Sequence, residues 1–375
     1  IVVFLFTSKQ FISGLTRGAI NMYIFYNEEN MIKKLLACGI AAMLCVCALC
    51  ACSPGTEDGD DVTEPEGREI LSDTSFKDGI AVSNLDSRDV ATTQWKYSGN
   101  VESSVAAAWS LGQYCDLSTT RDGYDSSVND LSLGTIFDDP EDITGIESVV
   151  SDGVYSLTNH SGSKEIVVDT NEGSVELNAD TSKEYIDENG DILPRRDGED
   201  WVHMILGQAA GGVRVADYSE VRVRIEFTVT EWELFDRTGG ASQFQWIFSI
   251  KDYESDVGDY FWFNMTFFDD RYTEAVFPGN GLYDGGKDDA TDKYIYAPSG
   301  SHYSEDPIKV GQTYKVDIDI KPLVKEAFDD AKAKGALEQS AFENMGLNSL
   351  NIGWEVTDVA KVGVKIKGLS LWVVE

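Results

Sequence analysis

Apolar and polar residues alternate along several stretches in the second half of the chain. In residues 221–230 the odd-numbered positions are Val, Val, Ile, Phe and Val, and the even-numbered ones are Arg, Arg, Glu, Thr and Thr. An alternation with period two gives a β-strand one apolar and one polar face. The same pattern predicts strands over residues 314–320 and 362–374, and Gly368 interrupts the second of these and predicts a bulge.

Further strands are expected on both sides of this stretch. Residues 164–169 and 174–179 are two short β-prone runs separated by Thr-Asn-Glu-Gly, which predicts a hairpin. Residues 244–250 and 260–268 are rich in aromatic side chains, and we expect these strands to be buried on both faces.

One helix is predicted, with Pro322 at its start and Gly335 as its C-terminal stop. A second, shorter helical piece is expected over residues 336–344, and the two would cover an end of the fold. The first helix has one apolar stripe: Leu323, Ala327, Phe328 and Ala331. Many strands and few helices predict an all-β fold, an antiparallel jelly-roll β-sandwich with one or two short helical inserts.

Composition excludes some classes of function. The full chain has a net charge of −35, residues 1–51 carry +2, and −37 therefore remains for the rest. Such an acidic chain repels nucleic acid and anionic lipid headgroups, so we expect no nucleic-acid partner. Five of the six cysteines lie at or before Cys52, which leaves Cys115 alone in the folded part. A disulfide framework is thus excluded there, stability must come from an apolar core, and Cys115 is expected to be one of its small buried residues.

The N-terminal part has the pattern of an export signal. Residues 31–51 begin Met-Ile-Lys-Lys and continue with an apolar run of about 15 residues. This run is shorter than the roughly 20 residues that a transmembrane helix needs. The sequence Leu-Cys-Ala-Cys that ends at Cys52 resembles the lipobox of bacterial lipoproteins. This resemblance implies that Cys52 is lipidated and that the protein is extracytoplasmic, anchored to the cell membrane or outer surface only through its lipid. An ordinary signal peptide or an uncleaved anchor is the alternative.

The chain is accordingly divided into four parts. We interpret residues 1–30 as upstream translation that is not native, and residues 31–51 as the lipoprotein signal peptide. Residues 52–67, rich in Gly, Pro and acidic side chains, are expected to be a flexible tether. Residues 68–375 are expected to form the jelly-roll domain, and a division near residue 217 into two domains is the alternative.

The last stretch, residues 347–375 with its Trp354-Glu355 pair, resembles the closing strands of concanavalin A-like lectin/glucanase jelly rolls. Residues 194–208 and 259–272 resemble segments of glycan-related surface proteins of gut bacteria. The resemblance implies a polysaccharide or glycan partner, and it allows other surface glycan-processing proteins as partners. The E-x-D-x-x-E run of the glucanase branch is absent, so its carboxylate pair cannot be carried over.

Candidate site residues gather in three segments, residues 196–203, residues 262–272 and the pair 354–355. If a strand begins at Trp201, then Trp201, His203 and Ile205 share one face, which suggests a groove side opposite an apolar core side. With an arginine to neutralise a uronate, His203 could abstract a sugar-ring proton, although a histidine bonded to a backbone carbonyl explains the pattern as well. For a hydrolase, Glu355 would pair with Asp200 or Asp269. The catalytic candidates are His203, Arg196, Tyr272 and Glu355; the ligand-binding candidates are Arg196, Asp200, Trp201, His203, Trp262, Asp269, Arg271 and Trp354.

Two further features concern loops and metals. The long stretch 278–303, with several Gly, Tyr and Asp residues, is expected to be a functional loop or a solvated excursion. The spacing of Asp187, Asn189 and Asp191 does not fit an EF-hand and favours a hairpin turn. Structural calcium elsewhere is possible, with Asp78 as a candidate ligand. With three histidines in the chain, a histidine-rich transition-metal site is not expected.

Three functions are consistent with these patterns. The first is a surface-tethered lipoprotein that binds polysaccharide through an aromatic-lined groove, without being an enzyme. The second is a glycoside hydrolase or polysaccharide lyase on the same fold. The third is a protein-binding adhesin, for which a flat face without a groove would be the sign.

Overall fold

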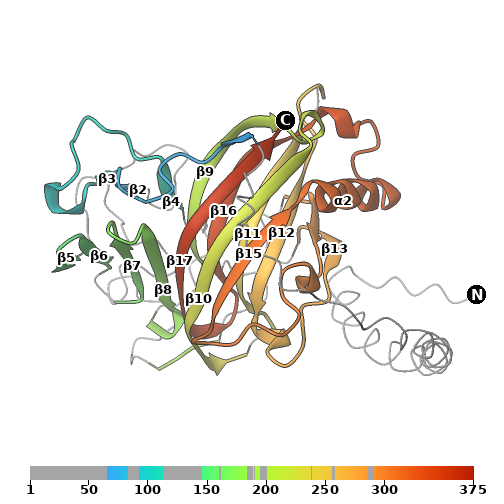
Figure 1. The fold of residues 1–375 in the computed structure, drawn as a ribbon. Coiled ribbons are helices and arrows are strands. Elements are labelled where there is room, and N and C mark those ends of the chain that lie inside the picture. Colours follow the sequence, from blue (N-terminus) through green and yellow to red (C-terminus); the bar gives the residue numbers. More distant parts are fainter. Residues whose placement is uncertain are drawn as a thin grey trace, which may run out of the picture. The chain divides into compact units, whose positions relative to one another are not determined.

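The computed structural model describes residues 66–82, 93–112, 146–159, 162–183, 189, 191–194, 201–237, 239–255, 258–285 and 291–375. In this part of the chain two sheets, in which antiparallel pairs predominate, form a sandwich (Figure 1). The all-β class and the antiparallel β-sandwich expected from the sequence are therefore confirmed. The signal, residues 52–65 of the expected tether, Cys115, Arg196 and Asp200 lie outside the described residues, whereas Gly67, assigned to the tether, already belongs to strand β1 (Gly67–Glu69).

The first sheet has the strand order β15-β10-β17-β8-β7-β6-β5, and β1 also pairs with β17. Its bounds are β1 Gly67–Glu69, β5 Ile146–Ser151, β6 Val154–Thr158, β7 Lys164–Asp169, β8 Ser174–Asp180, β10 Glu220–Asp236, β15 Thr313–Asp319 and β17 Val359–Val374. We call it sheet A. The predicted alternation is confirmed in β10, where Val221, Val223, Ile225 and Phe227 are buried and the even-numbered residues between them are half-buried.

The second sheet has the order β13-β14-β12-β11-β16-β9-β4-β2-β3 and is called sheet B. Its bounds are β2 Ile80–Val82, β3 Thr93–Trp95, β4 Trp109–Gly112, β9 Val202–Arg214, β11 Ser242–Asp252, β12 Tyr260–Asp269, β13 Asn280–Tyr283, β14 Tyr294–Ala297 and β16 Met345–Val356. Two of its pairs, β2 with β4 and β12 with β14, are parallel. The stretch predicted as a long loop over residues 278–303 thus supplies two strands to the edge of sheet B.

The core lies between the two sheets, where large side chains from both meet. Phe227 on β10 packs against Phe244 on β11 with ring centroids 5.4 Å apart, and Phe244 packs against Trp354 on β16 at 5.7 Å. Trp246 and Trp354 are fully buried. Burying rings of this size supplies much of the free energy that holds the sheets together.

Helix α2, Lys321–Ala333, begins at Lys321 and has Pro322 in its first turn, as predicted. It buries the predicted apolar stripe together with Val324. It packs beside β12, β13 and β14 and beside β10, so it covers an open side of the sandwich rather than an end (Figure 1).

The prediction of a second helix over residues 336–344 is wrong. After α2 the backbone turns at Gly335 (φ 86°) and again at Leu337 (φ 54°), and two left-handed residues so close together prevent a helix from continuing. Only a 3₁₀ turn, Phe342–Asn344, forms in this stretch. The other 3₁₀ turns described are Tyr97–Gly99, Thr181–Lys183, Val215–Asp217, Asp270–Tyr272 and Gly300–His302. Among the described residues no helix is both long enough and apolar enough to span a membrane.

Candidate functional site

The outer face of sheet B is hollowed into a groove of about 1060 Å³. The alternation of β9 decides which of its side chains face the groove. Val202, Met204 and Leu206 are fully buried in the core, while Trp201, His203 and Ile205 line the groove. The facing predicted from the sequence for this segment is therefore confirmed.

Strand register arranges the groove floor in four rows that run across the sheet. The rows, written from β9 towards β12, are His203–Glu355–Gln243–Asp269, Ile205–Gly353–Gln245–Thr266, Gly207–Asn351–Ile247–Asn264 and Ala209–Ser349–Ser249–Trp262. Ser110 of β4 extends the third row, and Ile295 of β14 with Leu282 of β13 extends the fourth. Most of the polar side chains in these rows are uncharged amides and hydroxyls.

Glu355 is the carboxylate in the first row that faces the groove, and each of its oxygens has a polar side chain beside it. The Nε2 of Gln245 donates to its Oε2 at 2.6 Å, and the Nε2 of His203 lies 3.4 Å from its Oε1. The Oε1 of Gln245 accepts long hydrogen bonds from the Thr266 hydroxyl (3.4 Å) and from the Asn264 amide (3.5 Å), which fixes the orientation of the glutamine. The Trp201 ring packs on the imidazole of His203, with ring centroids 5.7 Å apart. These contacts hold Glu355 in one position at the groove floor.

Asp269, two strands from Glu355 in the same row, is covered. Its side chain has no exposed surface, and it accepts hydrogen bonds from the Nε of Arg271 (2.8 Å) and from the Gln243 amide (2.8 Å). The hydrogen bonds that the Arg271 guanidinium donates to Asp269 raise the pKa of Arg271. Arg271 lines the groove, so the groove presents the guanidinium and hides the carboxylate.

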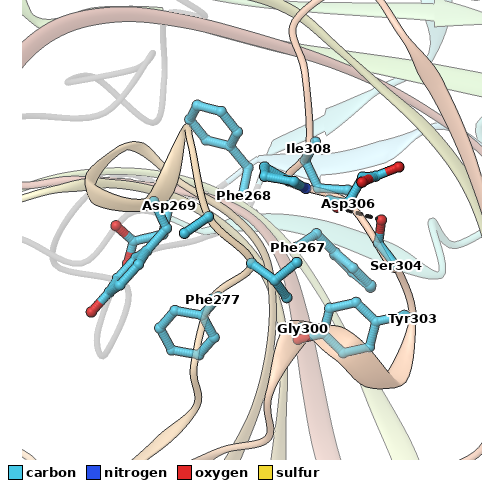
Figure 2. Close-up of a pocket in the computed structure, with 13 residues that line it drawn as sticks. Phe267, Phe268, Asp269, Phe277, Gly300, Tyr303, Ser304, Asp306 and Ile308 are labelled. Carbon is cyan, nitrogen blue, oxygen red and sulfur yellow. Dashed lines mark hydrogen bonds between the residues drawn. The ribbon is translucent and has the colours of Figure 1, made fainter. Parts of the chain in front are cut away.

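Tyr272 lies in a different place from the groove. Its ring packs edge-on against Phe277, and it lines a small pocket of about 20 Å³. Figure 2 shows this pocket with Asp269, Phe277 and Tyr303 among its lining residues. A cavity of this size holds about one water molecule and cannot take a sugar ring. The structure therefore does not bring Tyr272 together with His203 among the described residues that line the groove.

One other ligand-binding candidate is also corrected, and the structure places the candidate calcium ligand. Trp354 is fully buried and packs against Phe244 and Phe268, so it belongs to the core and cannot touch a ligand in the groove. The candidate calcium ligand Asp78 donates its backbone N–H to the side chain of Asp73 at 2.8 Å. Among the described residues no three His, Cys, Asp or Glu side chains are placed to hold a metal ion.

The sequence analysis missed the amides of the floor, above all Gln243, Gln245, Asn264 and Asn351. Gln243 and Gln245 alternate with Phe244 and Trp246, and this period of two was the signal that could have found them. The aromatic content of the strand led instead to the expectation of burial on both faces. Both faces of the strand are indeed little exposed, and Gln245 is only 3% exposed. The expectation nevertheless missed that one of the two faces is polar.

Comparison with known proteins finds only distant structural similarity. No family model matches the sequence, and no curated protein matches it. Among solved structures, a family 12 xyloglucanase from Bacillus licheniformis is similar at 9% identity and a TM-score of 0.32, over 61% of this chain and 96% of that one. An endoglucanase from Rhodothermus marinus gives 15% identity and 0.32 over the same shares. A family 11 xylanase from Neocallimastix patriciarum gives 9% and 0.30, over 61% of this chain and 95% of that one.

Proposed function

We propose that the groove of sheet B binds a polysaccharide chain. The observation that carries this proposal is the chemistry of the floor, where uncharged amides and hydroxyls surround Glu355 and two half-buried tryptophans, Trp201 and Trp262, face the same space. Amides, hydroxyls and a carboxylate match the hydroxyl groups of a sugar, and an indole ring matches its apolar face. A groove also counts against the third hypothesis, a protein-binding adhesin, whose sign would be a flat face.

Glycoside hydrolysis on the same face is the second candidate function. It is favoured by the position of Glu355, which faces the groove and shares a row with Asp269. Two strand spacings separate these residues, about 10 Å between their Cα atoms. An inverting glycosidase holds its two carboxyl groups about 6.5–9.5 Å apart. The hidden position of Asp269 beneath Arg271 favours binding over hydrolysis, because a general base must reach a water molecule.

A polysaccharide lyase receives less support. The described arginine of the groove, Arg271, is already paired with Asp269, and Tyr272 lies outside the groove. A lyase of the predicted kind needs an arginine that neutralises a uronate. Arg196, the other candidate for that task, lies outside the described residues.

The test is a binding assay of residues 53–375 on neutral and acidic polysaccharides, followed by analysis of any products. Glu355→Gln is the informative variant, because it keeps the shape of the side chain and removes its carboxylate. If the protein only binds, Glu355→Gln weakens retention by about tenfold or less and no product forms with either protein. If the protein hydrolyses, wild type releases sugars and Glu355→Gln does not. Glu338→Gln, at an exposed position after α2, is the control. Failure to bind any member of the panel would exclude the proposal.

The proposed place of action is the cell surface. The export signal and the lipobox-like sequence before Cys52 support a lipid anchor, with the groove domain held outside the membrane by the acidic tether. In an expressing bacterium, Cys52→Ser should abolish labelling by a fatty-acid analogue and release the protein from the membrane fraction.

A further inference from the structure

Trp201 and Trp262 lie at opposite ends of the groove floor. Trp201 comes just before β9, two residues ahead of His203 and the first row, whereas Trp262 belongs to the fourth row. Both line the same continuous groove. A ligand that contacts both must therefore cross all four rows.

The fourth row ends in an apolar surface made by three adjacent strands. Register places Trp262 of β12 next to Ile295 of β14, and Ile295 next to Leu282 of β13. We call these three residues the apolar platform. Leu282 is 45% exposed although it is aliphatic, and Trp262 and Ile295 are half-buried. All three line the groove.

The platform is supported from the side by Tyr260, which lies two residues before Trp262 on β12 and therefore on the same face of the sheet. The ring of Tyr260 packs edge-on against Trp262 with centroids 5.4 Å apart, and the ammonium group of Lys293 lies 5.0 Å from the centre of the Tyr260 ring. A fixed indole ring loses little conformational entropy when a sugar stacks on it. Apolar side chains that a fold leaves exposed inside a groove indicate a ligand that covers them.

The strand geometry gives the distance from Glu355 to the platform. Glu355 and Ser349 are six residues apart on β16, which corresponds to about 20 Å along the strand. Ser349 shares the fourth row with Trp262, and two further strand spacings lie between them, so the direct separation is slightly more than 20 Å. A monosaccharide or disaccharide cannot span this length.

We propose that the apolar platform is a distal sugar subsite, and that one extended, neutral glycan chain of several sugar units occupies the groove from Trp201 past Glu355 to this platform. The inference rests on the proposed function, because it assumes that the groove binds glycan. It adds that affinity depends on chain length, and that Trp262, Ile295 and Leu282 determine this dependence.

The experiment is isothermal titration of the 53–375 protein with β-1,4-linked gluco- and xylo-oligosaccharides of two to eight units, with the two polymers as further probes. For wild type we expect affinity to rise up to the length that reaches the platform and then to level off. Trp262→Ala should weaken binding of the longest probes about tenfold or more, with a smaller loss for short probes. Trp262→Phe should restore part of the loss, since it keeps an aromatic ring. Leu282→Ala should act in the same direction with a smaller effect.

Phe235→Ala is the matched control. Phe235 is 40% exposed on β10 and does not line the groove, so its removal should leave every affinity unchanged. Thermal melting of each variant tests whether the fold persists. Binding that does not depend on chain length, or that is equally strong in a folded Trp262→Ala protein, would overturn the distal subsite while leaving the proposed function intact. Binding of no oligosaccharide and no polymer would overturn both.

Discussion

At the scale of single residues, the groove depends on Gln245, which is 3% exposed and joins three other floor side chains. It donates to Glu355 and accepts from Thr266 and Asn264. Reversing its amide would point an oxygen at the Glu355 carboxylate, so the hydrogen-bond network selects one orientation. Glu355 is thereby positioned by residues that the sequence analysis did not single out.

Replacing this amide by a carboxylate tests the network. Gln245→Glu places a second carboxylate where the amide donated 2.6 Å from Glu355, and two such groups cannot both ionise without repulsion. The folded variant will bind a proton that the unfolded chain releases, so its stability falls as pH rises above about 4. Urea unfolding should show a loss of about 1–3 kcal/mol at pH 7.5 that becomes smaller at pH 4.5. Gln339→Glu, at an exposed site, should show no such pH dependence. Equal stability of Gln245→Glu and wild type at pH 7.5 would contradict the network.

A second polar cluster lies beneath Arg237, near the end of the groove. The guanidinium of Arg237 pairs with Asp270 (3.0 Å) and Asp358 (3.1 Å), and both carboxylates have no exposed surface. Burial raises the pKa of Asp270 above its ordinary value. Arg237→Met should therefore cost about 3–5 kcal/mol at neutral pH, because it leaves buried carboxylates without their cation.

The pH dependence of this loss has a defined sign. Protonation removes the buried charge, so the cost of Arg237→Met should shrink as pH falls towards and below the raised pKa of Asp270. Urea unfolding of wild type and Arg237→Met at several pH values measures this change in cost. Arg222→Met is the control, because Arg222 pairs with Asp317 on the outer face of sheet A, where ion pairs contribute about 0–1 kcal/mol. A cost that is the same at pH 4 and pH 7 would argue against charge burial as its cause.

At the scale of elements, the period of two made most strands predictable and also explains which site residues were misplaced. Successive side chains of a strand point to opposite faces, so Trp354 and Glu355 cannot both face the groove. Glu355 faces it, and Trp354 is in the core. Sequence alone could place β9, since its two faces differ in polarity. It could not assign β11, because the aromatic side chains of one face obscured the glutamines of the other. Arg271 covers Asp269 because of the turn that follows β12. The conformation of this turn cannot be predicted from the alternation of apolar and polar residues.

The predicted bulge in β17 offers a test at this scale. Gly368 has φ 62°, and the register between β10 and β17 shifts at this point. A Cβ at Gly368 would meet nothing within 4 Å. The change in stability of Gly368→Ala therefore measures only the cost of placing a side chain on a left-handed backbone conformation. We expect it to lower the free energy of unfolding by about 1 kcal/mol. Gly368→Asn should cost less, because Asn tolerates this conformation better. A neutral Gly368→Ala would mean that the strand passes this point without a left-handed residue.

At the scale of the whole molecule, the two sheets present different chemistry to solvent. The outer face of sheet A carries linked ion pairs, such as Lys315 and Lys367 on either side of Glu226. The outer face of sheet B carries the groove, in which the described cations of Lys or Arg type are limited to Arg271. Because Arg271 is paired with Asp269, the described part of the groove offers an anionic ligand little compensation.

Net charge and groove chemistry together predict selectivity for neutral chains. The protein carries −35 over the full sequence, and the repulsion between this charge and a polyuronate is long-ranged at low salt. Affinity electrophoresis through gels that contain neutral glucan, xylan or polygalacturonate, at about 20 mM and 300 mM NaCl, measures the effect. We expect retention by a neutral polymer to be independent of salt, since hydrogen bonds and ring stacking are screened little. Polygalacturonate should retain the protein weakly or not at all at low salt, and any retention should increase with salt as the repulsion is screened. The opposite trend, tight binding of polygalacturonate that salt weakens, would require a cationic site in the groove and would restore the lyase hypothesis.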